Sequence, residues 1–257
     1  MTENELRQKV VKGIIVYNGA KKGSTKHKEI LSIFNKSGLC KRYVMTVNDA
    51  WCATTASAAY IKSGLAGDGK GKIFPCVECS CGRMIEKAKT AGIWVEKDNY
   101  IPKPADLVMY DWDDNGSGDC TGAPEHVGIV VSVANNTIRV FEGNKDNACG
   151  YRNIAVNSRY IRGFITPKFS SIATKPKPVL ETKGYKKGDS TRGVLALKEL
   201  LLIARKKKII TSNLDETKTF GSGTEKAVNE LLKKWGYKQT GIAGTKFIKK
   251  LKDKLSK

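Results

Sequence analysis

The order in which two kinds of pattern follow one another constrains the fold of this chain most strongly. Before Pro104, small and apolar residues fall into helix-length segments that end at glycines. After Pro104, short apolar runs of strand length follow one another, with turn residues between them. Helices followed by consecutive strands predict an α+β domain in which the helices pack on an antiparallel sheet.

Local signals place the individual elements. Thr2-x-x-Glu5 is a capping box and predicts a helix that runs to about Tyr17. Further helices are expected over residues 26–36, from about 49 to 64, and over 80–90. Strands are expected over residues 106–112, 127–133, 137–141, 151–156 and 161–165. Asn135-Asn136 separates two of these strands and can supply the positive φ angles of a tight hairpin.

A second, smaller domain is expected at the C-terminal end. Residues 169–183 contain two prolines together with Ser, Thr and Lys, a composition typical of a linker. Beyond it, apolar residues recur at helical spacing in three segments: residues 194–205, 224–235 and 245–255. We therefore expect one domain over residues 1–168 and a three-helix, all-α domain over residues 184–257.

Charge is distributed unevenly between these regions. The formal net charge is +21, with 24 Lys and Arg against 17 Asp and Glu in residues 1–168, and 22 against 8 in residues 169–257. Such a field favours polyanions, which include nucleic acid, anionic lipid and the anionic polymers of a bacterial wall. No apolar run reaches the roughly 20 residues that span a bilayer. The polar start also lacks the pattern of a secretion signal, so we expect synthesis in the cytoplasm.

Two residues far apart in the sequence form a candidate catalytic pair. Cys52 lies at a predicted helix start, where the macrodipole and free N–H groups stabilise a thiolate. His126 opens the most apolar strand, from whose end it can point into a cleft. A cysteine on a helix that faces a histidine on a strand is the papain-type arrangement. The alternative is that Cys52 packs in the core and His126 is structural.

Other polar residues follow from this pair. Glu142 and Asn144 end the strand after that of His126, so either can accept a hydrogen bond from the imidazole and orient it. The second histidine, His27, lies among lysines and is expected to be a solvated helix residue.

These segments resemble a known family. Asp-Ala-Trp-Cys at 49–52, Pro-Glu-His-Val-Gly-Ile-Val at 124–130 and Glu-Gly-Asn at 142–144 resemble, in this order, the cysteine, histidine-dependent amidohydrolase/peptidase (CHAP) domain. The likeness extends over about residues 1–167 and is to CHAP domains of phage lysins that act on Gram-positive hosts in particular.

The resemblance implies a papain-like fold and a role for each residue. Cys52 is then the nucleophile, His126 the base, Glu142 the orienting residue and Asn144 a supporting polar residue. The backbone N–H of Cys52 is the natural first donor to an oxyanion.

The surroundings of the pair supply further candidates. Asn48 or Tyr43 is a candidate for the second oxyanion donor. We expect Asn48, Trp51 and Trp112 to contact substrate.

The C-terminal residues 184–257 resemble the three-helix peptidoglycan-binding module found beside many wall hydrolases. The likeness rests on Phe220-Gly-Ser-Gly-Thr-Glu-Lys-Ala-Val228 and on Gly241-Ile-Ala-Gly-Thr245. Leu231-Leu232 departs from the Phe-Gln pair that is usual there. The alternative is a helical bundle that binds protein or nucleic acid, because a strongly positive domain also suits phosphates. We expect peptidoglycan and anionic wall polymers as partners, and no nucleic acid.

One acidic loop suggests calcium. Asp111-Trp-Asp113-Asp-Asn115-Gly fits the opening of a calcium loop, with Asp119 at the ninth position. The glutamate expected at the twelfth position is replaced by Gly122. The alternative is an acidic surface loop. We expect no required cofactor, with calcium as the one metal to test.

The cysteines predict free thiols rather than disulfides. The chain has seven cysteines and no secretion signal, which argues against a disulfide framework. Cys76-x-x-Cys79-x-Cys81 suggests zinc, but the partner pair of a structural zinc site is missing. We expect this segment to border the substrate groove with its thiols reduced.

Together these features predict a phage endolysin, a peptidoglycan hydrolase that cuts an amide bond by cysteine chemistry. Family habit favours an N-acetylmuramoyl-L-alanine amidase over an endopeptidase that cuts a stem-peptide or cross-bridge bond. Such a protein is expected to wait in the host cytoplasm and to reach the wall after holin-dependent release. The alternatives are a non-catalytic wall- or nucleic-acid-binding protein and a cysteine protease of ordinary proteins.

Overall fold

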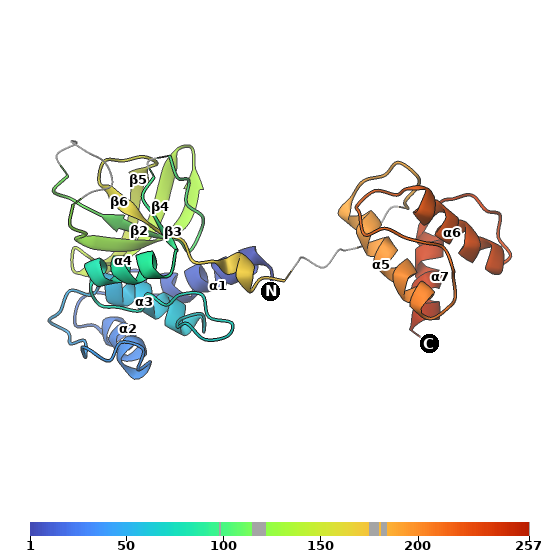
Figure 1. The fold of residues 1–257 in the computed structure, drawn as a ribbon. Coiled ribbons are helices and arrows are strands. Elements are labelled where there is room, and N and C mark those ends of the chain that lie inside the picture. The colour runs from blue at the N-terminus through green and yellow to red at the C-terminus, as the bar shows by residue number, and fades with distance from the viewer. Residues whose placement is uncertain (98, 115–121, 175–179, 181–183, 257) are drawn as a thin grey trace. The chain divides into compact units, whose positions relative to one another are not determined.

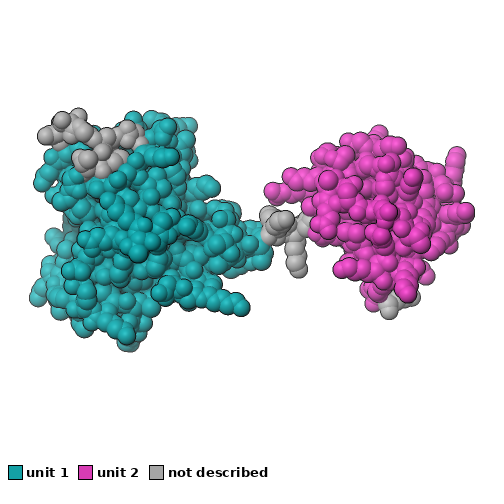
Figure 2. Space-filling model, viewed as in Figure 1, with its two compact units in different colours: residues 1–175 teal, residues 176–257 magenta. Residues whose placement is uncertain are grey.

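Two compact units make up the chain. The computed structural model describes residues 1–97, 99–114, 122–174, 180 and 184–256. Unit 1 is residues 1–175 and unit 2 is residues 176–257 (Figure 2). Each unit has its own apolar core. None of the helices in these described ranges is long and apolar enough to cross a membrane.

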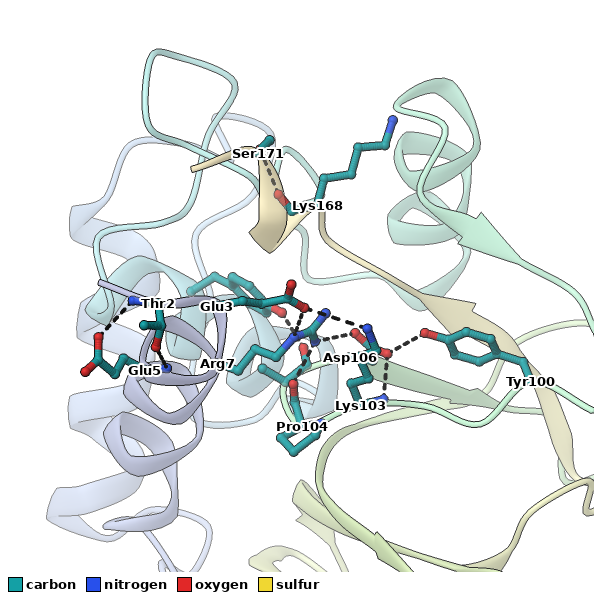
Figure 3. Close-up of polar contacts among 12 residues, drawn as sticks. Thr2, Glu3, Glu5, Arg7, Tyr100, Lys103, Pro104, Asp106, Lys168 and Ser171 are labelled. Atoms are coloured by element: carbon teal, nitrogen blue, oxygen red, sulfur yellow. Dashed lines mark hydrogen bonds and ion pairs between the residues drawn. The ribbon is translucent and has the colours of Figure 1, made fainter. Parts of the chain in front are cut away.

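Unit 1 opens with helices. They are α1 (Glu3–Ile15), α2 (Thr25–Lys36), α3 (Cys52–Lys62) and α4 (Cys81–Thr90). The predicted capping box starts α1, since Thr2 N–H donates to Glu5 Oε2 at 2.8 Å and Glu5 N–H donates to Thr2 Oγ1 at 3.3 Å (Figure 3). This box satisfies two N–H groups that the helix itself leaves without partners.

A six-stranded antiparallel sheet follows, so the predicted α+β class is confirmed for this unit. The strands are β1 (Trp94–Val95), β2 (Leu107–Tyr110), β3 (His126–Ala134), β4 (Thr137–Lys145), β5 (Ala148–Ala155) and β6 (Ile161–Ile165). Their order in the sheet is β1-β6-β2-β3-β4-β5. Asn135 and Asn136 form the β3–β4 hairpin turn with φ angles of 48° and 57°. Both angles lie in the left-handed region that the sequence predicted for this turn.

The helices cover one face of the sheet (Figure 1). Along β2, Leu107 and Met109 share a core with side chains of α1, α3 and α4. Val108 and Tyr110 alternate with them and join a second apolar cluster on the opposite face. Helix α3 contacts α1, α2, β3 and β4. It is therefore buried along most of its length, which explains why its residues are small.

A buried charge network joins α1 to the start of β2 (Figure 3). Arg7 of α1 donates to Asp106 Oδ1 at 2.9 Å and to Glu3 Oε1 at 2.8 Å. Asp106 also accepts from the Tyr100 hydroxyl at 2.7 Å and from Lys103 N–H at 2.9 Å. Because Asp106 is fully buried, these donors supply what water would otherwise provide.

The two ends of unit 1 lie side by side. The Met1 ammonium donates to Thr174 Oγ1 at 3.1 Å, and Thr174 N–H donates to Met1 O at 2.8 Å. Just before Thr174, the 3₁₀ helix η1 (Phe169–Ser171) buries Phe169 in the core. The linker expected over residues 169–183 therefore begins later in the chain, because Phe169 packs as part of unit 1. Within that segment, residues 175–179 and 181–183 lie outside the described residues.

Unit 2 contains α5 (Arg192–Lys206), α6 (Ser222–Lys234) and α7 (Thr245–Leu255). Apolar residues from the three helices meet in one core, which includes Leu197, Val228 and Leu251. Leu231 and Leu232, where the sequence departs from the wall-binding pattern, are buried in the same core. Their side chains therefore pack inside unit 2 rather than face a ligand.

Candidate active site

Cys52 is the first residue of α3. Trp51 occupies the N-cap position and makes no side-chain capping bond, which leaves the first N–H groups of the helix free for another acceptor. The Ala53 N–H is one of them and donates to the Cys52 sulfur. This local structure favours a thiolate at position 52.

His126 is the first residue of β3 and lies beside Cys52. Its Nε2 is 3.2 Å from Glu142 Oε2, and the ring lies close enough to the Cys52 sulfur for each group to shift the pKa of the other. Because Nε2 is directed at Glu142, Nδ1 is the ring nitrogen that remains for the sulfur. The structure thus brings together the three residues that the sequence analysis placed in one catalytic group.

The two partners stabilise each other's charged form. The pKa of the Cys52 thiol lies well below its ordinary value. The hydrogen bond with Cys81 lowers it most, and His126 lowers it further. Together they outweigh burial, which raises the pKa. Burial also works against the imidazolium, but hydrogen bonds to Cys52 and Glu142 raise the pKa of His126 to about 9. Both shifts favour the thiolate–imidazolium form of the pair.

Glu142 holds the imidazole from a buried position in β4. Arg152 of β5 donates from Nε to Glu142 Oε1 at 2.8 Å, while Oε2 faces His126. Burial would raise the pKa of Glu142, yet His126 and Arg152 together hold it below its ordinary value. Gly128 of β3 makes room for this side chain, because a Cβ there would lie 2.9 Å from Glu142 Cγ. Neither Arg152 nor Gly128 was predicted.

Aromatic rings lie next to the imidazole. Trp112 and Tyr110 stack with ring centroids 4.5 Å apart, and the Trp112 centroid is 6.4 Å from that of His126. The guanidinium of Arg152 lies 4.6 Å from the Trp112 ring centroid. Trp112 is only half-buried, so its position beside His126 is compatible with the predicted contact to substrate.

The structure separates the three cysteines of the Cys76–Cys81 segment. Cys81 is the first residue of α4, and its sulfur lies 3.9 Å from that of Cys52. Cys76 is buried in the core. Cys79 lies with Cys40 and Glu78, whose ligand atoms are all within 4.8 Å of one another. The sequence analysis expected this segment to border the substrate groove, but it did not predict the contact of Cys81 with the nucleophile, because that contact joins two helix starts 29 residues apart.

Two predictions about aromatic residues near Cys52 are wrong. Trp51 is fully buried and does not reach a substrate groove. Its ring packs against His27, with centroids 4.3 Å apart. His27 is itself fully buried, and its Nδ1 accepts a hydrogen bond from Gly23 N–H at 2.9 Å. The neighbouring lysines suggested a solvated position, but His27 is on the face of α2 that packs inward.

The other polar candidates lie around the site without joining it. Asn48 is exposed four residues before Cys52. Tyr43 is exposed, and its hydroxyl donates to Asp49 Oδ1 at 2.9 Å. Asn144 is half-buried with a φ of 57°, where the β4–β5 register shifts. In the part of the chain that the structure describes, no hydrogen bond joins Asn144 to His126.

The proposed calcium ligands fall partly outside the described residues. Asn115 and Asp119 belong to the segment that is not described. Asp111 is buried and accepts a hydrogen bond from Asp113 N–H at 3.2 Å. Calcium binding therefore stays a prediction, and the melting temperature measured with and without a chelator tests it.

One known protein family matches part of the chain. Residues 38–144, less than half of the chain, match the CHAP domain family. A search of curated proteins gave no match.

Several solved structures are similar to parts of the chain. One is a peptidoglycan-binding protein from Clostridioides difficile in complex with glutamine hydroxamate, with 22% identity, 60% of this chain and 75% of that chain covered, and a TM-score of 0.23. Another is Ly7917 with the hydrolyzing product of MDP. It is 13% identical, the match covers 74% of this chain and 70% of that chain, and the TM-score is 0.37. A third is an NlpC/P60 family protein from Bacillus cereus. It is 14% identical, the match covers 44% of this chain and 30% of that chain, and the TM-score is 0.28.

The segment over residues 38–144, which carries Cys52, His126 and Glu142, is matched by the CHAP domain family.

Proposed function

We propose that this chain is a peptidoglycan hydrolase that cuts an amide bond of the bacterial wall with Cys52 as its nucleophile. The observation that carries the proposal is the Cys52–His126–Glu142 group at the start of α3, inside the segment that matches the CHAP family. The pKa shifts of the two partners favour the thiolate and the imidazolium that the first chemical step needs.

The geometry suggests how the reaction proceeds. The Cys52 thiolate attacks the amide carbonyl, and we assign the N–H groups at the start of α3 as donors to the oxygen that becomes negative. The His126 imidazolium gives its proton to the departing amine. The neutral imidazole then takes a proton from water, which attacks the thioester and releases the acid product. Glu142 keeps the ring in place throughout, and Arg152 keeps Glu142 ionised.

Within this class we favour the muramoyl–L-alanine amide as the bond that is cut, in a phage endolysin released from the host cytoplasm by a holin. This preference rests on the resemblance alone. Mass spectrometry of digested walls distinguishes the two bonds. New alanine N-termini with intact cross-links support an amidase, whereas cut stem peptides or cross-bridges would identify an endopeptidase.

Clearing of purified Gram-positive walls tests the hydrolase itself. We expect the wild type to clear them and Cys52→Ala to lose activity by roughly a thousandfold or more. Cys79→Ser is the matched control, because Cys79 is on the same side of the fold but faces Cys40 and Glu78. Equal clearing by wild type and Cys52→Ala would remove Cys52 as the nucleophile. Binding to walls without clearing would favour a non-catalytic wall protein, and digestion of casein a general cysteine protease.

A further inference from the structure

Cys81 is a second thiol at the candidate active site, and the proposed reaction does not use it. Its sulfur lies 3.9 Å from the Cys52 sulfur, and both residues are buried, with 8% and 7% of their surface exposed. Each is the first residue of its helix, so the starts of α3 and α4 meet at the two sulfurs. Both thiols are free.

The surroundings give the two thiols different roles. Cys52 is the anionic member, because His126 and the Ala53 N–H act on it directly. The pKa of Cys81 lies far above its ordinary value, first because of its hydrogen bond with Cys52 and also because of burial. Cys81 therefore holds its proton and donates it toward the Cys52 thiolate. A reactive thiolate with a second thiol in contact is the arrangement in which an oxidised cysteine can condense to a disulfide.

We propose that Cys81 is a resolving thiol, which condenses with peroxide-oxidised Cys52 to form a disulfide that switches the enzyme off reversibly. The reactant at this modification site is a peroxide. The inference rests on the proposed function to the extent that Cys52 is taken as the reactive nucleophile.

The chemistry balances in two steps. The Cys52 thiolate attacks one peroxide oxygen, the O–O bond breaks, and the departing hydroxide takes a proton from the His126 imidazolium and leaves as water. Sulfur loses two electrons and becomes a sulfenic acid. The Cys81 sulfur then attacks the Cys52 sulfur, the S–O bond breaks, and the Cys81 proton leaves with the hydroxide as a second water. A dithiol such as dithiothreitol returns both thiols.

Distance and competition both favour this pair. The sulfurs are 3.9 Å apart and have to close to the bonded distance of about 2.05 Å. Cys76 and Cys149 are buried, and burial raises the pKa of each thiol to about 12, so they react slowly with peroxide. Cys79 has Cys40 as its nearest thiol partner. Among the described cysteines, Cys81 is thus the thiol placed to intercept oxidised Cys52.

The test treats the full-length chain with hydrogen peroxide and reads the thiols by mass spectrometry of proteolytic peptides. In the wild type we expect a Cys52–Cys81 cross-linked peptide, loss of wall clearing, and recovery of clearing with dithiothreitol. In Cys81→Ala we expect no cross-link, Cys52 carrying two added oxygens, and a loss that dithiothreitol does not reverse. Each variant is compared with its own untreated activity, and circular dichroism verifies its fold.

The control is Cys79→Ser, two residues earlier on the same segment. It should form the Cys52–Cys81 cross-link and recover like the wild type. A cross-link confined to Cys40 and Cys79, or reversible inactivation that persists in Cys81→Ala, would overturn the proposal. Since the cross-link is read by mass, a chain that forms it without clearing walls would contradict the proposed function and still support the role of Cys81.

Discussion

Glu142 has two cationic neighbours, and its negative charge helps to set the pH at which His126 loses its proton. His126 faces one carboxylate oxygen and Arg152 the other. The imidazolium must be present to protonate the leaving amine, so activity should fall as the pH rises through the pKa of His126, which is about 9. On the acid side, activity should fall where the Cys52 thiolate becomes protonated.

Replacing Glu142 with glutamine tests this assignment. Glu142→Gln keeps the size of the side chain and removes its charge, so the pKa of His126 should fall. We expect the alkaline limb of the kcat/KM profile to move to lower pH by about 1–3 units. The comparison is a pH profile of wild type, Glu142→Gln and Glu86→Gln, an exposed carboxylate on α4. An unmoved limb would mean that Glu142 does not control the imidazole.

The residues of the site differ in how visible they are in the sequence. Cys52 and His126 stand in short motifs, so their proximity could be predicted. Arg152 and Cys81 reach the site only because β5 pairs with β4 and because α4 starts beside α3. Trp51 was misread because the sequence shows a tryptophan next to the nucleophile but not the direction of its ring. Such contacts depend on tertiary packing, which a local pattern does not encode.

At the scale of elements, the approach of α3 to β4 sets the position of the nucleophile. A Cβ on Gly143 of β4 would lie 2.0 Å from Thr55 Oγ1 and 2.6 Å from Thr55 Cβ, in the first turn of α3. Only a glycine lets the strand and the helix come this close. Gly143 directly follows Glu142, so the same contact fixes the distance between the Cys52 helix and the orienting carboxylate.

Gly143→Ala should therefore push α3 away from β4. We expect the free energy of unfolding to fall by about 1–3 kcal/mol, as for other overpacked contacts, and wall clearing to fall with it. Urea denaturation and clearing rates measure the two effects. Gly150→Ala on the neighbouring strand β5 is the control, because the nearest atom to its Cβ would be 3.9 Å away. Equal stability of the two variants would show that the contact does not matter.

Element boundaries show what the sequence left open. The expected strand over 137–141 is longer in the structure, where β4 runs to Lys145. Glu142-Gly143-Asn144 looks like a strand end, because it breaks the apolar alternation, yet pairing with β5 continues through a register shift. Strand β1 was missed because two residues are too short for any periodic signal. The expected helices and the antiparallel sheet depend on longer patterns and could be predicted.

At the scale of the whole molecule, charge and core are divided between two units. Residues 176–257 hold 21 Lys and Arg against 8 Asp and Glu. The helices of unit 2 have a core of their own. We propose a division of labour, in which unit 1 cuts and the strongly positive unit 2 holds the anionic wall.

A chain that ends at residue 175 should keep catalysis and lose attachment. We expect the shortened chain to cleave soluble wall fragments. A smaller fraction of it than of the full chain should sediment with intact walls. Binding by the full chain should weaken as salt is added, since screening reduces the attraction of exposed charges. Co-sedimentation over a salt series measures both effects. Unchanged sedimentation of the shortened chain would contradict the role assigned to unit 2.

The contact between Met1 and Thr174 has a consequence for engineering. Ends that already touch can be joined by a short peptide, and new ends can be opened in an exposed loop elsewhere. Lys70 lies in such a loop between α3 and α4. Unit 1 should thus tolerate circular permutation there, which would let its cutting activity be grafted into a host protein through both termini.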